Sequence, residues 1–201
     1  MELTYIIAAS HSGSTLLSML LGSHPQIATI GEMKLSLQAM GDIDRYRCSC
    51  GELIQECDFW QKVKEGMATR GFDFDLCNAR TDYRTTQSRY ACRLLGPLVR
   101  RQFLESCRDL ALNLSPLWRK QLPEIHRRNS AFISTIKEIT GTKVVIDSSK
   151  IGLRLKYLLK NPDLNVKVIR LIRDGRAVAL TYMNPAVFAD PGDIQAHQAS
   201  R

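Results

Sequence analysis

The chain has 201 residues, 44% of them hydrophobic and 24% charged, which is typical of a single globular domain with a sizeable core. A formal net charge of +8 favours anionic partners. Because there is no block of like charges and no aromatic interleaving, we expect a small anionic ligand rather than nucleic acid. No apolar run is long enough to span a bilayer, and Glu2 argues against a signal peptide, so we expect a cytoplasmic protein.

The first predicted elements are a buried strand over residues 3–9, LTYIIAA, and a helix over residues 14–22. Small residues and Gly13 connect them. The first N–H groups of a helix have no intrahelical acceptor, and the helix dipole favours an anion there. Gly13 permits a tight turn, and Ser12, Ser14 and Thr15 add hydroxyl donors. We therefore expect a phosphate-binding loop; the alternative is an ordinary strand–turn–helix connection.

This loop differs from the nucleotide-binding pattern G-x-x-x-x-G-K-[ST], in which the lysine reaches the outer phosphates and the hydroxyl binds magnesium. Here Ser14 stands at the lysine position and Ala8 at the position of the first glycine. We expect a donor without a γ-phosphate and a reaction that requires no metal.

A short second strand is predicted at residues 27–30, and Gly31 and Glu32 follow it. A carboxylate at the end of a strand is a candidate general base. The alternative is an exposed loop glutamate.

Three of the six cysteines lie close together in the segment CSCGELIQECDFW, with the spacing C-x-C-x6-C. Cys48, Cys50 and Cys57 with a fourth ligand would suit zinc. C-x-C is not the usual spacing of a zinc knuckle, so we favour a structural cluster of reduced thiols and leave zinc binding open.

From about residue 58 to 140 the pattern is mostly helical, with Pro97, Pro116 and Pro123 as punctuation. After it we expect a strand at 143–147, a helix at 149–162, a strand at 165–172 and a helix at 174–183. Strand–helix units on both sides of a helical insertion predict an α/β fold with a central parallel sheet.

In such a sheet, ligands bind beyond the carboxyl ends of the strands. Residues 10–15, 147–150 and 173–176 each follow a predicted strand and would meet at that edge. Arg173 with Thr181, two helical turns further on, suits a second phosphate. Lys150 is expected at the start of a helix, where a cation opposes the dipole, so a role toward a ligand is favoured over a surface position. Alone, Arg173 and Thr181 are more typical of a solvated surface than of a site, and Lys150 is equally typical of either.

The segments SHSGSTLLSMLLGSHPQIATIGE and VIRLIRDGRAVALTYM resemble the P-loop sulfotransferases that use 3′-phosphoadenosine 5′-phosphosulfate (PAPS). The resemblance is to the bacterial branch, related to the tyrosyl-protein and carbohydrate sulfotransferases. CSCGELIQECDFW is also similar to a segment of bacterial members. The resemblance covers roughly residues 3–60 and 140–183. It implies one sulfotransferase-like domain over residues 1–201, with a P-loop NTPase-like three-layer fold and an insertion at about 58–140.

The resemblance also implies roles for residues. Glu32 would be the catalytic base, and Lys150 would assist. Arg173 and Thr181 would bind the 3′-phosphate. The implied ligands of the 5′-phosphosulfate are Ser12, Gly13, Ser14, Thr15 and Leu16.

Two departures from the family are clear. His11 stands where the family usually has lysine or arginine. A histidine carries a positive charge only part of the time near neutral pH, so His11 is a candidate catalytic residue that stabilises the transition state less, and Lys150 would supply the positive charge instead. The chain also ends at Arg201, soon after the second motif, and we expect it to lack the C-terminal part of the family fold, as a fragment or as a truncated gene product.

The expected activity is transfer of a sulfuryl group from PAPS to a hydroxyl or amine of a carbohydrate, lipid or peptide acceptor. The alternatives are a P-loop kinase-like phosphotransferase and a degenerate nucleotide-binding domain. The sequence does not indicate the oligomeric state.

Overall fold

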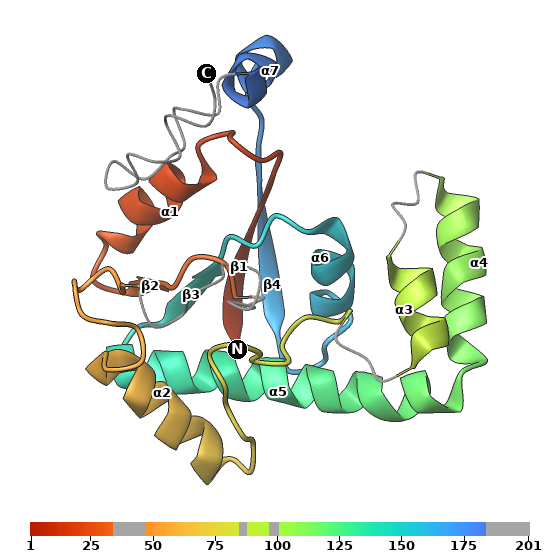
Figure 1. The fold of residues 1–201 in the computed structure, drawn as a ribbon, viewed down its shortest axis with the longest axis horizontal. Coiled ribbons are helices and arrows are strands. Elements are labelled where there is room, and N and C mark those ends of the chain that lie inside the picture. Colours follow the sequence, from red (N-terminus) through yellow and green to blue (C-terminus); the bar gives the residue numbers. More distant parts are fainter. Residues whose placement is uncertain (34–46, 85–87, 97–100, 184–201) are drawn as a thin grey trace, which may run out of the picture.

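The computed structural model describes residues 1–33, 47–84, 88–96 and 101–183, and these residues form four strands and seven helices (Figure 1). Pro97 and the tail after residue 183 lie outside them. In chain order the elements are β1 (Glu2–Ala8), α1 (Ser14–Gly22), β2 (Ile27–Thr29), α2 (Asp58–Thr69), α3 (Arg89–Leu95), α4 (Gln102–Asn113), α5 (Pro116–Thr140), β3 (Val144–Asp147), α6 (Gly152–Leu158), β4 (Asn165–Leu171) and α7 (Gly175–Met183).

The four strands form one parallel sheet in the order β2-β3-β1-β4. β1 lies between β3 and β4, with Tyr5 opposite Asp147 on one side and Val168 on the other. The predicted α/β fold with a parallel sheet and a large helical insertion is confirmed at this level. The carboxyl ends of the strands lie together at one edge, near α1 and α7 (Figure 1).

Helices cover the sheet on both faces. Alternate residues of a strand point to opposite faces. Leu3, Tyr5 and Ala28 belong to the buried cluster that includes side chains of α5 and α6, whereas Thr29 contacts Ser18 of α1. α1 therefore packs on the face opposite to α5 and α6. The chain leaves β1 toward β2 and leaves β3 in the other direction, toward β4, and in parallel α/β sheets ligands bind beyond the ends of two strands arranged in this way.

Small residues set the contact between α1 and β2. α1 buries Ser14 and Ser18, and the Ser18 hydroxyl lies 2.5 Å from the Thr29 hydroxyl. A Cβ atom on Gly22 would meet the Thr29 methyl group at 2.6 Å, so only glycine allows this approach. The outer apolar side chains of α1 are exposed: Leu16, Met19 and Leu20.

α5, the longest helix among the described residues, follows capping rules at both ends. The Ser115 hydroxyl accepts the Trp118 N–H, and Pro116 occupies the first turn, where its missing N–H costs nothing. Gly141 ends the helix with φ of 66°, a left-handed conformation that favours glycine. Pro123 lies inside the helix and does not end it, so the prediction that this proline divides the helical region was wrong.

The insertion packs onto the sheet through aromatic and aliphatic side chains. Trp60 of α2 stacks on Phe74, and Phe74 stacks on Phe132 of α5. The apolar face of α5, which includes Ile133 and Ile136, then continues this core to the sheet. At the β4 edge of the sheet, the side chains of β4 and α7 are more exposed to solvent, and α7 has no buried residue.

Candidate functional site

The loop after β1 forms an open turn at the N-terminus of α1. Gly13 precedes α1 with φ of 87°, and a Cβ atom there would meet nothing within 4 Å, so the turn is open to an approaching group. Within the described part of the chain, no side chain caps the helix N-terminus. The buried Ser12 hydroxyl has no hydrogen-bond partner among the described residues. Because an unpaired buried hydroxyl is costly, this atom fits the phosphate oxygen of a bound ligand.

His11 has a left-handed backbone, with φ of 60°. Such a conformation is strained for a residue with a side chain and is frequent at functional sites. Its carbonyl accepts a hydrogen bond of 2.7 Å from the Arg173 guanidinium, and its ring lies edge-on to Tyr182, with centroids 4.6 Å apart. The loop after β1 and the loop after β4 are therefore in direct contact, as the sequence predicts.

The second motif is arranged as a helix start. Asp174 caps α7 by accepting the Arg176 N–H at 2.8 Å. Thr181 donates its hydroxyl proton to the Ala177 carbonyl at 2.7 Å, within its own helix, which leaves lone pairs of the oxygen for another donor. Hydrogen bonding by the Asp174 carboxylate to the Arg176 side chain and N–H lowers its pKa.

Glu32 and Lys150 form an ion pair of 2.9 Å between the segments after β2 and β3. Both line a cavity of about 740 Å³, together with Thr15 of α1. The apolar part of its wall includes Ile30 and Trp60. The structure thus brings three of the predicted site residues, from three separate segments, to one cavity. The remaining predicted residues lie on the neighbouring loop and helices: His11, Ser12, Gly13, Ser14, Leu16, Arg173 and Thr181.

Lys150 does not lie in the first turn of a helix. α6 begins at Gly152 with Ile151 as its N-cap, and Lys150 precedes both, with φ of 61°. The Tyr5 hydroxyl bonds both the carbonyl and the N–H of Ile151, each at 2.9 Å, and this fixes the backbone next to the lysine. The expected position at the helix start was wrong by two residues, and the dipole argument does not apply.

A buried ion pair holds the segments that carry Glu32 and Lys150. Asp147 and Arg154 are fully buried, and the Arg154 Nε donates to Asp147 Oδ2 at 2.8 Å. Burial lowers the pKa of Arg154, but the Asp147 charge outweighs this effect and raises the pKa above its ordinary value. The other guanidinium nitrogens donate to the Thr81 carbonyl at 2.6 Å and to the Asn129 side-chain oxygen at 2.9 Å. Each of the three guanidinium nitrogens therefore donates to a buried acceptor.

The second oxygen of Asp147 organises the loops. It accepts the Ser149 N–H at 2.9 Å and the Met33 N–H at 3.4 Å. Ser149 directly precedes Lys150, and Met33 directly follows Glu32. The Ser148 N–H also donates to the Gly31 carbonyl at 3.0 Å. Sequence reasoning placed Asp147 at the edge of the site but missed Arg154 and Asn129. The signal that could have identified both residues is a polar side chain on the face of a helix that is otherwise apolar and buried.

The three clustered cysteines form another wall of the cavity. Their sulfur atoms lie within 4.8 Å of one another, and all are free thiols. Burial raises the pKa of Cys48, but hydrogen bonds from the Cys50 N–H and from neighbouring thiols bring it below its ordinary value. Burial raises the pKa of Cys57, which stays above its ordinary value although the Trp60 N–H opposes the effect.

Comparison of the chain with models of protein families, with curated proteins and with solved structures gave no significant match. Among the described residues, no helix combines the length and the apolar character needed to cross a membrane.

Proposed function

We propose that this protein is a PAPS-dependent sulfotransferase with a P-loop NTPase-like core. The observation that carries the proposal is the meeting of the loop after β1 with the Glu32–Lys150 pair at one edge of a parallel sheet. Thr15, at the start of α1, lines the same cavity as that pair. A helix N-terminus for an anion, a base and a cation are the groups that transfer of an anionic group to a hydroxyl requires, and the first turn of α1, Glu32 and Lys150 contribute to one cavity.

The loop fits a phosphosulfate donor. The Ser12 hydroxyl, the open turn at Gly13 and the uncapped start of α1 offer donors to an anion without a lysine in the loop. Arg173 is next to this turn through its bond to His11, and it provides a cation for a second phosphate. PAPS would supply the activated sulfuryl group.

The protein side chains then have distinct tasks. Glu32 accepts the proton of the acceptor hydroxyl or amine, and Lys150 stabilises negative charge on the group in transfer. In the present structure Lys150 holds Glu32 in place at 2.9 Å. The Asp147 carboxylate fixes the backbone on both sides of this pair, so Asp147 is a positioning residue.

Titration calorimetry with 3′-phosphoadenosine 5′-phosphate, with and without magnesium, tests the donor site. We expect binding that does not depend on magnesium. Magnesium-dependent binding of ATP in its place would overturn the proposal in favour of a kinase. A labelled-sulfate transfer assay against carbohydrate, lipid and peptide acceptors then tests the reaction, and binding without transfer to any of them would indicate a nucleotide-binding domain that has lost catalysis.

A further inference from the structure

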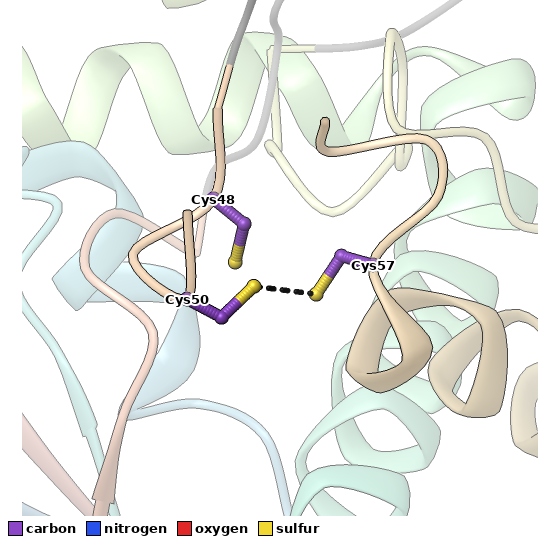
Figure 2. Close-up of side chains that lie close together, drawn as sticks. All are labelled: Cys48, Cys50 and Cys57. Atoms are coloured by element: carbon purple, nitrogen blue, oxygen red, sulfur yellow. Dashed lines mark hydrogen bonds between the residues drawn. The ribbon is translucent and has the colours of Figure 1, made fainter. Parts of the chain in front are cut away.

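Three thiols from two segments point toward one another (Figure 2). All three residues also line the cavity. Cys48 and Cys50 lie in the loop before α2, and Cys57 is the N-cap of α2. Their sulfur atoms all lie within 4.8 Å of one another, and Cys50 and Cys57 are 3.6 Å apart. A zinc–sulfur bond is about 2.3 Å long, so a tetrahedral site places its sulfurs about 3.8 Å apart. The observed spacing is close to that value without any movement of the backbone.

Two backbone hydrogen bonds close the loop that carries the first two thiols. The Cys48 N–H donates to the Glu52 carbonyl at 2.8 Å, and the Gly51 N–H returns to the Cys48 carbonyl at 2.9 Å. Gly51 has φ of 93°, which closes this turn. These backbone bonds fix the turn that carries Cys48 and Cys50, as outer contacts fix the ligands around bound metals.

The third sulfur lies at the N-terminus of α2. Cys57 directly precedes the first turn of this 12-residue helix as its N-cap residue. The positive end of the helix dipole thus faces a group that becomes anionic when it binds a metal. Arg47 adds a cation to the same loop, because its guanidinium donates to the Gly51 carbonyl at 2.7 Å.

We propose that Cys48, Cys50 and Cys57 bind one Zn²⁺ ion as three thiolates, with water in the fourth position on the cavity side. Binding forms three Zn–S bonds and releases the three thiol protons to solvent. The resulting centre carries one negative charge, which the Arg47 guanidinium and the α2 dipole stabilise. The site ties the loop to α2, and it does not depend on the proposed sulfuryl transfer.

Cobalt(II) is the probe for this site because thiolate coordination gives it strong absorption. The full chain, reduced with a phosphine and titrated with Co²⁺, is expected to show thiolate-to-cobalt charge-transfer bands and tetrahedral d–d bands at one ion per chain. Stoichiometric Zn²⁺ should bleach them. Cys50→Ser, at an exposed position, should lose the bands, and Cys107→Ser, an exposed cysteine on α4, should retain them. Arg47→Ala should weaken binding by about 10-fold or more.

Three results would overturn the proposal. The first is the absence of charge-transfer bands, and the second is bands that persist unchanged in Cys50→Ser. The third is a disulfide between Cys50 and Cys57 in the protein purified without reductant but with Zn²⁺, detected by alkylation and mass spectrometry. Zinc protection of these thiols from alkylation in the native chain supports the site even if Cys57→Ser fails to fold.

Discussion

At the scale of single residues, Glu32 and Lys150 constrain each other. A carboxylate that is paired to an ammonium group at 2.9 Å is held in one orientation but shares its lone pairs with that cation. The lysine must turn toward the group in transfer for the carboxylate to take a proton. Each side chain therefore acts in the proposed reaction only if the other is in place.

Removal of either member should abolish most of the sulfuryl transfer. We expect Glu32→Ala and Lys150→Ala each to lower turnover by about 10² to 10³-fold, the usual cost of one positioned catalytic group. Binding of 3′-phosphoadenosine 5′-phosphate should change little. The matched controls are Glu124→Ala and Lys143→Ala, both at exposed positions. Full transfer activity in Glu32→Ala would eliminate this glutamate as the base.

Arg173 is expected to act in binding rather than in chemistry. Arg173→Ala should weaken binding of 3′-phosphoadenosine 5′-phosphate by about 10- to 100-fold, because a hydrogen bond to a charged group is lost. Calorimetry measures this directly. Arg176→Ala is the control, since Arg176 is three residues away and its exposed side chain pairs with Asp174. Equal losses in both variants would mean that the effect is one of net charge alone.

At the scale of elements, the Asp147–Arg154 pair joins β3 and α6 to α5 and to the segments around Met33 and Thr81. A buried pair contributes little net stability compared with apolar side chains, but loss of one partner leaves an uncompensated charge in the core. The pair therefore matters most for the arrangement of the loops at the carboxyl edge of the sheet.

Arg154→Met should lower the free energy of unfolding by about 3–5 kcal/mol, measured by urea denaturation. Arg84→Met is the control, because it breaks a partly exposed ion pair with Asp82, and it should lower the free energy of unfolding by less than about 1 kcal/mol. The double variant Asp147→Asn, Arg154→Met should recover part of the loss because no unpaired charge remains. A loss for Arg154→Met as small as that of the control would refute the role of the pair.

Element positions followed well from the sequence where one local signal dominates. The apolar run of β1 and the start of α1 after Gly13 are of this kind. Pro123 misled because packing of the long apolar face of α5 outweighs the local cost of a proline. Lys150 was placed in a helix because composition does not reveal that Tyr5, far away in the sequence, fixes the turn at Ile151.

The candidate site was only partly predictable for the same reason. Residues directly after strands, such as Glu32 and Lys150, could be assigned to one edge because parallel strands end together. Arg154 and Asn129 could not be assigned, since a polar residue on a helix gains meaning only when its partner from another segment is known. The convergence of the three thiols likewise depends on how the turn before α2 folds back, which spacing alone leaves open.

At the scale of the whole molecule, His126 links stability to pH. It lies on α5, is 9% exposed, and its Nδ1 is 3.0 Å from the Tyr83 hydroxyl. Burial lowers its pKa from the ordinary value of 6.5, and the Asp163 charge opposes this only in part. The folded protein thus keeps the ring neutral while the unfolded chain takes up a proton below about pH 6.5. The unfolded state is then favoured as the pH falls.

We therefore expect the free energy of unfolding to decrease between about pH 7.5 and pH 5.5, by up to about 1.4 kcal/mol per pH unit below 6.5. Urea denaturation at both values measures the change. His126→Gln, which does not titrate in this range, should show a smaller pH dependence even if it is less stable at both values. His24→Gln, at an exposed position, is the control. An unchanged slope in His126→Gln would exclude this histidine as the cause.

His11 and Lys150 have a left-handed backbone at the ends of adjacent strands, where a glycine would be unstrained. Each such residue lowers the stability of the folded state by about 1–3 kcal/mol, and the chain nevertheless has both. Directed evolution for heat resistance alone would therefore be expected to replace these two positions with glycine early. Selection that also demands ligand binding should restore the original side chains, so the two regimes would separate what the molecule needs to fold from what it needs to act.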